Sequence, residues 1–181
     1  MRVRPLALLN SKTRKKQTGM TLVEILVASV VLMIGLVGVL SMFGYLAAVM
    51  SYSDEEMIAR QKAREALESV IGARNSADYS WADIANVSNG GIFKDGATAM
   101  TNVGSDGIVN TSDDTGVETI TLPNGKTRKL SEFTRQVAIA PAMLGGATST
   151  TLSTVTITIT YPRGRFGTGS YSVVGYISSW N

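Results

Sequence analysis

The chain contains neither cysteine nor histidine. Without cysteine an exported domain has no disulfide, so its fold must depend on a packed core and on its neighbours. The same two absences exclude zinc sites of the usual ligand types and any catalysis by a histidine or cysteine side chain. Serine and threonine are plentiful, but no Gly-x-Ser-x-Gly elbow, Walker loop or plausible Ser-x-x-Lys site accompanies them. The sequence therefore indicates that the protein is not an enzyme.

Charge is almost absent from residues 20–50, where Glu24 is the only charged side chain. About 20 apolar residues suffice to cross the hydrocarbon of a bilayer as a helix, so this segment predicts a membrane-spanning helix. A carboxylate inside such a helix is unfavourable in lipid and by default indicates a functional site with a positive partner. Cleavage between Gly19 and Met20 creates such a partner, an α-amino group that is cationic near neutral pH. Within one helix this amine lies about one turn, roughly 6 Å, from Glu24, and in a bundle a neighbouring chain's amine can replace it.

Residues 1–19 carry positive charge and no acid. The basic residues are Arg2, Arg4, Lys12, Arg14, Lys15 and Lys16. The positive-inside rule predicts that this end stays in the cytoplasm and that the rest of the chain faces outward. In a secretory signal peptide the apolar segment precedes the cut, whereas here it follows Gly19, so the anchor is expected to remain after cleavage. An uncleaved single-span anchor is the alternative.

Removal of this leader reverses the sign of the net charge. The whole chain is +3, but six of its 17 basic residues lie in the leader, which leaves 11 basic against 14 acidic side chains and a net of −3. The basic pI therefore describes the leader, and we expect no general affinity of the mature protein for nucleic acid.

The residues around Gly19 resemble the prepilin peptidase site of the type IV pilin-like family. Residues 16–24 read Lys-Gln-Thr-Gly-Met-Thr-Leu-Val-Glu. They combine a basic leader, glycine before the cut, a hydrophobic residue after it, a hydroxyl residue next, and glutamate fifth in the mature chain. Met20 stands where phenylalanine is commoner in the family. The resemblance implies a class III signal peptide, cleavage after Gly19, N-methylation of Met20, and Glu24 as an assembly contact in a helical filament with the apolar helices at its core.

The same resemblance implies partners and a location. The partners are prepilin peptidase, an inner-membrane assembly platform, other pilin or pseudopilin subunits, and membrane lipid before assembly. The location is the bacterial inner membrane, crossed once, followed by an extracellular or periplasmic filament.

Residues 29–40 and 59–74 look like the PilV-type minor pilins, which implies a minor pilin that enters or primes a type IV pilus. A minor pseudopilin of a type II secretion system is one alternative. A membrane-tethered binding module that does not polymerise is another, although such a tether has no use for a buried acid.

Helical periodicity continues beyond the apolar run as far as Arg74. Small apolar residues recur three and four positions apart and form one stripe: Ala59, Ala63, Ala66, Leu67, Val70 and Ala73. The pattern predicts one helix from about Thr21 to Arg74, about 80 Å long, stopped by Gly72 and Asn75-Ser76.

Three glycines, Gly35, Gly38 and Gly44, weaken the middle of this helix, each by on the order of 1 kcal/mol relative to alanine. Small residues favour close packing between membrane helices. The family resemblance implies a second interpretation, a segment that melts as subunits enter the filament. Both interpretations are kept.

Beyond residue 116 the periodicity changes to two. Thr119–Leu122 leads into the turn Pro123-Asn124-Gly125, and Arg135–Ala140, Thr154–Tyr161 and Tyr171–Ser178 predict further strands. In the strand Thr154–Tyr161, the residues expected on one apolar face are Val155, Ile157, Ile159 and Tyr161. The stripe on the helix is expected to cover this face.

The predicted fold class is therefore α+β, a long N-terminal helix packed on an antiparallel sheet of three to five strands. It is also the fold that the pilin resemblance implies. The expected segments are a cleaved leader (1–19), a hydrophobic helix (20–50), its amphipathic continuation (51–75), a variable connecting region (76–116) and a sheet domain (117–181).

A loop in the connecting region gathers oxygen ligands of the kind that calcium takes. The candidate ligands are Asp106, Asn110, Asp113 and Asp114. Their spacing is not that of an EF-hand, and a solvated acidic turn is the alternative.

The turn between the last two predicted strands carries Arg163, Arg165 and Phe166. Arginines beside an aromatic ring can contact phosphates and stack on a base, or contact another partner. A hairpin tip with surface arginines is the alternative.

Overall fold

The computed structural model describes residues 19–122 and 125–179. The leader up to residue 18 and the predicted turn residues Pro123 and Asn124 lie outside the described part. The chain divides into two compact units, Met1–Tyr45 and Leu46–Asn181. One helix, α1 (Leu22–Asn75), begins in the first unit and ends in the second. This confirms the single long helix that the periodicity predicted.

In the first unit, α1 exposes its apolar side chains. Leu22, Val31 and Ile34 are 80%, 63% and 69% exposed, and no described side chain from residue 22 to residue 45 is buried. By its length and composition α1 can cross a membrane. Apolar surface of this extent is unfavourable in water, so this part of the helix needs lipid or other apolar helices around it.

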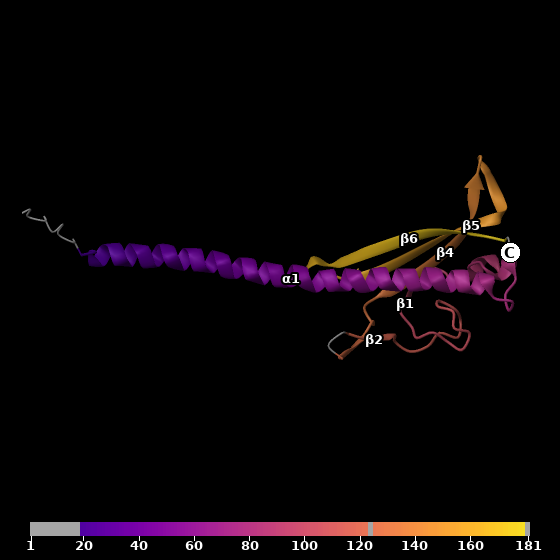
Figure 1. The fold of residues 1–181 in the computed structure, drawn as a ribbon, viewed down its shortest axis with the longest axis horizontal. Helices are drawn as coiled ribbons and strands as arrows, with labels where there is room; N and C mark the ends of the chain where they lie inside the picture. The colour runs from indigo at the N-terminus through magenta and orange to yellow at the C-terminus, as the bar shows by residue number, and fades with distance from the viewer. Residues whose placement is uncertain (1–18, 123–124, 180–181) are drawn as a thin grey trace, which may run out of the picture. The chain divides into compact units, whose positions relative to one another are not determined.

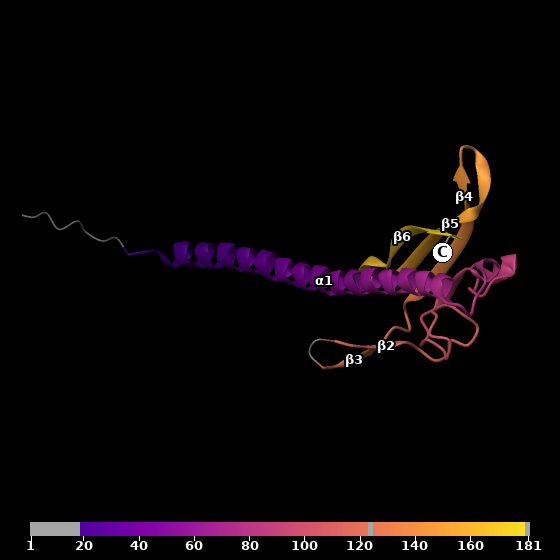
Figure 2. The same cartoon turned by 45° about the vertical axis from the view of Figure 1, so that its right-hand side comes forward.

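The second unit contains a four-stranded and a two-stranded antiparallel sheet among the described residues (Figures 1 and 2). The strands are β1 (Ala97–Ala99), β2 (Thr119–Thr121), β3 (Thr127–Lys129), β4 (Thr134–Leu144), β5 (Ala147–Pro162) and β6 (Thr168–Ser178). The larger sheet has the order β1-β4-β5-β6, and β2 pairs only with β3. Short 3-10 helices cover Trp81–Asp83, Val87–Asn89 and Gly164–Phe166.

The core lies between the sheet and the part of α1 in this unit. Ala59, Ala63 and Ala66 are completely buried, as are Ile157 and Ile159 on the facing strand β5. The stripe and the strand alternation predicted from the sequence are therefore both confirmed. Small alanine side chains allow the helix to lie close to the sheet, which places the larger strand residues in contact with it.

Contacts along β6 fix how this part of α1 lies on the sheet. The Arg60 guanidinium lies 5.3 Å from the centre of the Tyr171 ring, and Arg74 Nε donates to the Ser178 carbonyl at 2.6 Å. Between them, a Cβ added at Gly175 would lie 2.8 Å from Leu67 Cδ1, so a larger residue there would require the Leu67 side chain to shift. Residue numbers rise in the same direction on both elements, so α1 and β6 run parallel here.

Three details differ from the sequence expectations. A strand of the main sheet, β1, lies within the predicted connecting region, where three residues are too few to show a period of two. The predicted hairpin at Thr119 forms a separate sheet instead of joining the large one. Gly72 lies inside α1 and is not its stop, because helical hydrogen bonding continues to Asn75.

Candidate functional site

The predicted cleavage site lies directly before the start of α1. Gly19 and Met20 are exposed and outside regular secondary structure, and the helix begins at Leu22. A peptidase needs an accessible backbone outside helices and strands, and this segment provides one.

Thr21 caps the helix. Its Oγ1 accepts a hydrogen bond from the backbone N–H of Glu24 at 3.3 Å, and its carbonyl accepts from the same N–H at 3.0 Å. This places Glu24 in the first turn, where a carboxylate interacts favourably with the positive end of the helix dipole. A threonine three residues before a glutamate is the known signature of a capped helix start, so this role of Thr21 could have been predicted from the sequence.

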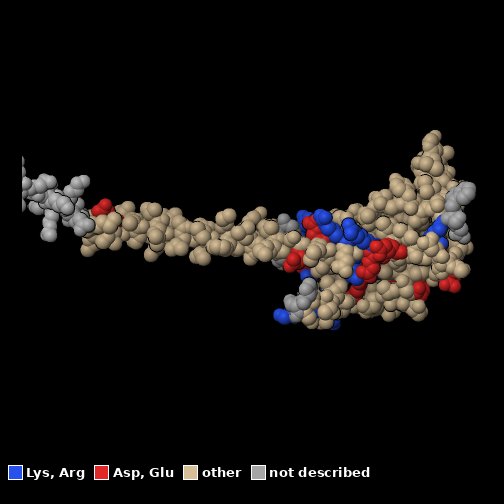
Figure 3. All heavy atoms as spheres, in the orientation of Figure 1, with Lys and Arg blue, Asp and Glu red and all other residues tan. Residues whose placement is uncertain are grey.

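Glu24 has no charged neighbour along the apolar part of the helix. On the face shown in Figure 3, the start of α1 carries one acidic patch and the following stretch carries no charged atoms. No described residue makes an ion pair with Glu24 within the single chain. We expect a positive partner for this carboxylate from the Met20 amine after cleavage or from another molecule.

The three glycines in the middle of the helix have open space around them. No atom lies within 4 Å of a Cβ added at Gly35, Gly38 or Gly44, and α1 is continuous through all three. Nothing in this unit requires glycine at these positions. Close packing against another helix and local melting during assembly both remain predictions.

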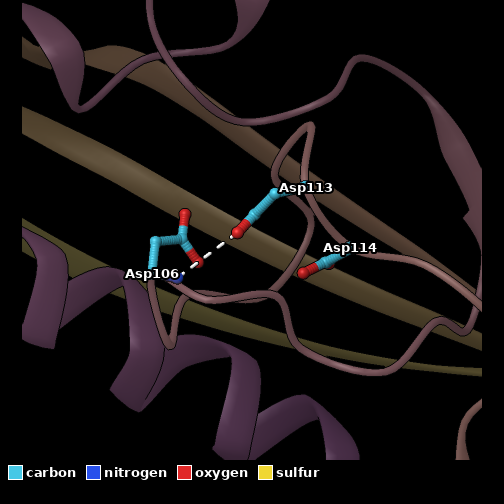
Figure 4. Close-up of side chains that lie close together, drawn as sticks. All are labelled: Asp106, Asp113 and Asp114. Atoms are coloured by element: carbon cyan, nitrogen blue, oxygen red, sulfur yellow. Dashed lines mark hydrogen bonds between the residues drawn. The ribbon is translucent and has the colours of Figure 1, made fainter.

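The acidic loop brings three of its four candidate ligands together. Carboxylate oxygens of Asp106, Asp113 and Asp114 lie within 4.8 Å of one another, and Figure 4 shows Asp113 and Asp114 pointing toward Asp106. The backbone approaches closely here, because a Cβ at Gly104 would lie only 2.2 Å from the Asp113 carboxylate. Asn110 is directed elsewhere, since its amide oxygen accepts from Thr98 Oγ1 at 2.7 Å.

Protein donors already bind all three carboxylates, and Asp106 Oδ1 accepts from the Ile108 N–H at 2.8 Å. Asp114 accepts from the backbone N–H groups of Gly104 and Asn110, at 3.0 and 2.6 Å. Asp113 accepts from Thr111 Oγ1 at 2.8 Å and from the backbone N–H of Asp106 at 3.3 Å. Of these contacts, the Thr111 hydroxyl does most to lower the pKa of Asp113. The loop thus has both the oxygen cluster of a cation site and enough hydrogen bonds to hold its shape without a metal.

The calcium hypothesis predicts that the ion stabilises the folded domain by mass action. Melting of the protein, followed by circular dichroism at matched ionic strength, should then occur at a lower temperature with chelator than with calcium. Asp106→Asn is the matched control, because asparagine keeps the Oδ1 that accepts from Ile108 N–H and loses the charge. The variant should melt at one temperature in both conditions. Equal melting temperatures for the unaltered protein would eliminate the metal hypothesis.

Beside the acidic loop lies a buried network of charges that sequence reasoning missed. The Arg135 side chain is 1% exposed, with Nη2 3.6 Å from Asp114 Oδ2 and Nη1 3.8 Å from Glu118 Oε2. Glu118 also pairs with Lys62 on α1, and Lys62 Nζ lies 2.6 Å from Glu65 Oε2. Alternation in β4 indicated a strand but gave no sign that one of its positions would bury a guanidinium.

Burial opposes the charge on both cations of this network, but their pKa values shift in opposite directions. It lowers the pKa of the Arg135 guanidinium, and the attraction of Glu118 and Asp114 opposes that shift. Burial also opposes the charge on Lys62, but hydrogen bonds to Glu118 and Glu65 outweigh it and raise the pKa of Lys62. The network therefore joins α1, the connecting region and β4 through ion pairs.

Of the two arginines in the last hairpin, the structure describes the side chain of Arg163. Arg163 is half-buried, lies over the Tyr161 ring at 5.5 Å and donates from Nη2 to Tyr161 Oη at 3.1 Å. Phe166 is 44% exposed on the turn Gly164–Phe166. Arg163 thus contributes to the packing of the sheet end, and contact of Arg163, Arg165 and Phe166 with a nucleic acid or another partner stays a prediction.

Comparison with known proteins identifies the N-terminal region. Residues 14–40 match a family model described as the prokaryotic N-terminal methylation motif. This motif is the class III signal peptide of type IV pilins, so residues 14–40 carry the processing signal of that family. The match supports a type IV pilin-like or pseudopilin protein. No curated protein and no solved structure matches the chain.

Proposed function

We propose that this protein is a minor pilin, a subunit that is incorporated into a type IV pilus or primes its assembly. Prepilin peptidase cleaves it between Gly19 and Met20, and the new amine of Met20 is methylated. The assembly platform of the inner membrane then transfers the apolar part of α1 from lipid into the filament core, among the helices of other subunits. The N-terminus faces the cytoplasm before assembly.

The observation that carries the proposal is the position of Glu24. It is the only charge in residues 20–50, it lies in the first turn of α1, and it follows the predicted cleavage site by four residues. A lone membrane anchor gains nothing from this carboxylate, because charge at such a depth is unfavourable. A filament subunit uses it twice, to neutralise a neighbouring amine and to set the axial stagger between helices.

The finer assignment to a minor pilin rests on the likeness of residues 29–40 and 59–74 to PilV-type minor pilins. Minor pseudopilins of type II secretion share the methylation motif and form the alternative. The two differ in phenotype. Deletion of a minor pilin should reduce the number of surface filaments, counted by electron microscopy, and leave secretion intact. Deletion of a pseudopilin should stop the release of secreted proteins, and loss of neither activity would refute both assignments.

Processing gives a direct prediction. Because Gly19 separates a basic leader from the apolar helix, intact-mass analysis of the envelope protein should find a chain that begins at N-methylated Met20. Gly19→Leu is expected to block cleavage, since the bulky side chain occupies the position next to the scissile bond. The helix is unaffected, because residue 19 precedes it. An unaltered chain that keeps residues 1–19 in cells with active prepilin peptidase would contradict the filament function.

A further inference from the structure

The two edges of the main sheet differ greatly in length. One edge, β1, has three residues, whereas the other, β6, has eleven, and it pairs with β5 from Thr168 to Ser178. Ser179 N–H donates to the Thr151 carbonyl at 2.8 Å, which identifies the residues of β6 that hydrogen-bond to β5. These are the odd-numbered ones. The even-numbered residues direct their N–H and C=O groups away from the sheet.

Most of this outward row is open. At its end, the Ser178 carbonyl accepts from Arg74 Nε at 2.6 Å. In the described part of the chain no backbone group bonds to the outer side of residues 168–176. In Figures 1 and 2, β6 forms the free margin of the sheet in both views.

The edge also lacks the features that protect exposed strands. Residues 168–178 contain no charged residue and no proline, and the register with β5 is continuous. Soluble proteins usually place charges, prolines or bulges on an edge of this length, because an unprotected edge recruits other strands. On the face of β6 that points away from the core, Val174 and Tyr176 are 54% and 66% exposed.

We propose that β6 is a docking edge, and that an extended segment of a different protein adds to it as a strand along Thr168–Tyr176. The alternating donors and acceptors repeat every two residues, about 6.8 Å, and only an extended backbone matches that spacing. The absence of charge on β6 selects an uncharged segment. The added segment carries apolar side chains beside Val174 and Tyr176, because cross-strand apolar pairs stabilise such an addition.

A second copy of this chain does not fit the edge, an exclusion that rests on the proposed filament function. Two copies joined through β6 would form a closed two-fold pair, whereas filament subunits repeat head to tail. Antiparallel pairing would also point the two α1 helices in opposite directions, because α1 runs parallel to β6 in each copy. The other edge, β1, is too short to cover the β6 of a neighbour.

Hydrogen exchange tests the docking edge at single residues. The processed full-length protein is compared as purified monomer in detergent, in sheared filaments and in the unsheared membrane fraction, with exchange quenched before dissociation. The outward amides of Ser170, Ser172, Val174 and Tyr176 should exchange rapidly in the monomer and about 100-fold more slowly when the edge is covered. The inward amides of Tyr171 and Val173 bond to β5 and should be slow in every sample. Outward amides that exchange equally fast in all samples would overturn the proposal.

Val174→Pro removes one outward N–H and leaves the pairing with β5, because proline is tolerated at outward positions of an edge strand. Val174→Thr keeps both the N–H and the branched shape and serves as the control. Val174→Pro should lose the protection at Ser172 and Tyr176, while Val174→Thr retains it. Equal protection in the two variants would show that something other than an added strand covers the edge.

Single cysteines identify a second copy directly, because the chain has none of its own. Ser172→Cys and Val174→Cys are oxidised in cells, and disulfide-linked homodimers would overturn the choice of a different protein as the partner. A different result would refute the proposed filament function, namely that the protein never enters the sheared fraction. Protection of the outward amides in the membrane fraction would support the docking edge even then.

Discussion

Glu24→Ala is expected to leave processed protein in the membrane and to reduce its incorporation into filaments by roughly a hundredfold or more. In a lone membrane helix the substitution removes an unfavourable charge, so insertion is unharmed or improved. In a packed bundle it leaves the Met20 ammonium without its partner. Breaking a buried pair by removing one member costs about 3 to 5 kcal/mol, which sets the size of the expected loss.

The measurement is the amount of this subunit in sheared and membrane fractions for each variant. Glu24→Gln keeps the shape and loses the charge, so its incorporation should be intermediate at best. Thr21→Val is a useful comparison, because it removes the hydroxyl that caps the helix and keeps the carboxylate. It should cost only about 1 kcal/mol of helix stability. Normal partitioning of Glu24→Ala would favour a tethered binding module that does not polymerise.

Arg135→Met is expected to destabilise the sheet domain by about 3 to 5 kcal/mol, because it leaves the buried carboxylates of Asp114 and Glu118 without their shared cation. The Arg135 side chain is 1% exposed, so little water can reach these carboxylates to replace the lost guanidinium. For a domain of this size the loss corresponds to a fall in melting temperature on the order of 10 °C, measured by circular dichroism.

Arg60→Met is the matched control for this prediction. Arg60 also makes an ion pair, 2.6 Å from Glu56, but its side chain is 59% exposed. Exposed pairs and cation–ring contacts each contribute little, so the change should leave the melting temperature nearly unchanged. Equal melting temperatures for Arg135→Met and Arg60→Met would show that the buried network adds nothing beyond a surface pair.

Local patterns predicted most of the fold. The alternation of Val155, Ile157 and Ile159 indicated a strand with one buried face, and the structure buries all three completely. The stripe from Ala59 to Ala73 indicated the matching helix face. Each pattern repeats within a few residues and is therefore visible in the sequence. Strand β1 was missed, because three residues show no repeat and only their pairing with Thr134, Arg135 and Gln136 of β4 defines the strand.

The candidate processing and assembly site was determined by the sequence itself. Gly19, Met20 and Glu24 lie within six residues of one another, so their spacing carries the information without tertiary contacts. The same is true of the apolar run that follows them. Only the tertiary structure decided the buried pairing of Arg135 with Asp114, the meeting of Asp106 with Asp113, and the open edge of β6. These features depend on which distant segments pack together, and that choice comes from long-range burial and strand pairing that no local period records.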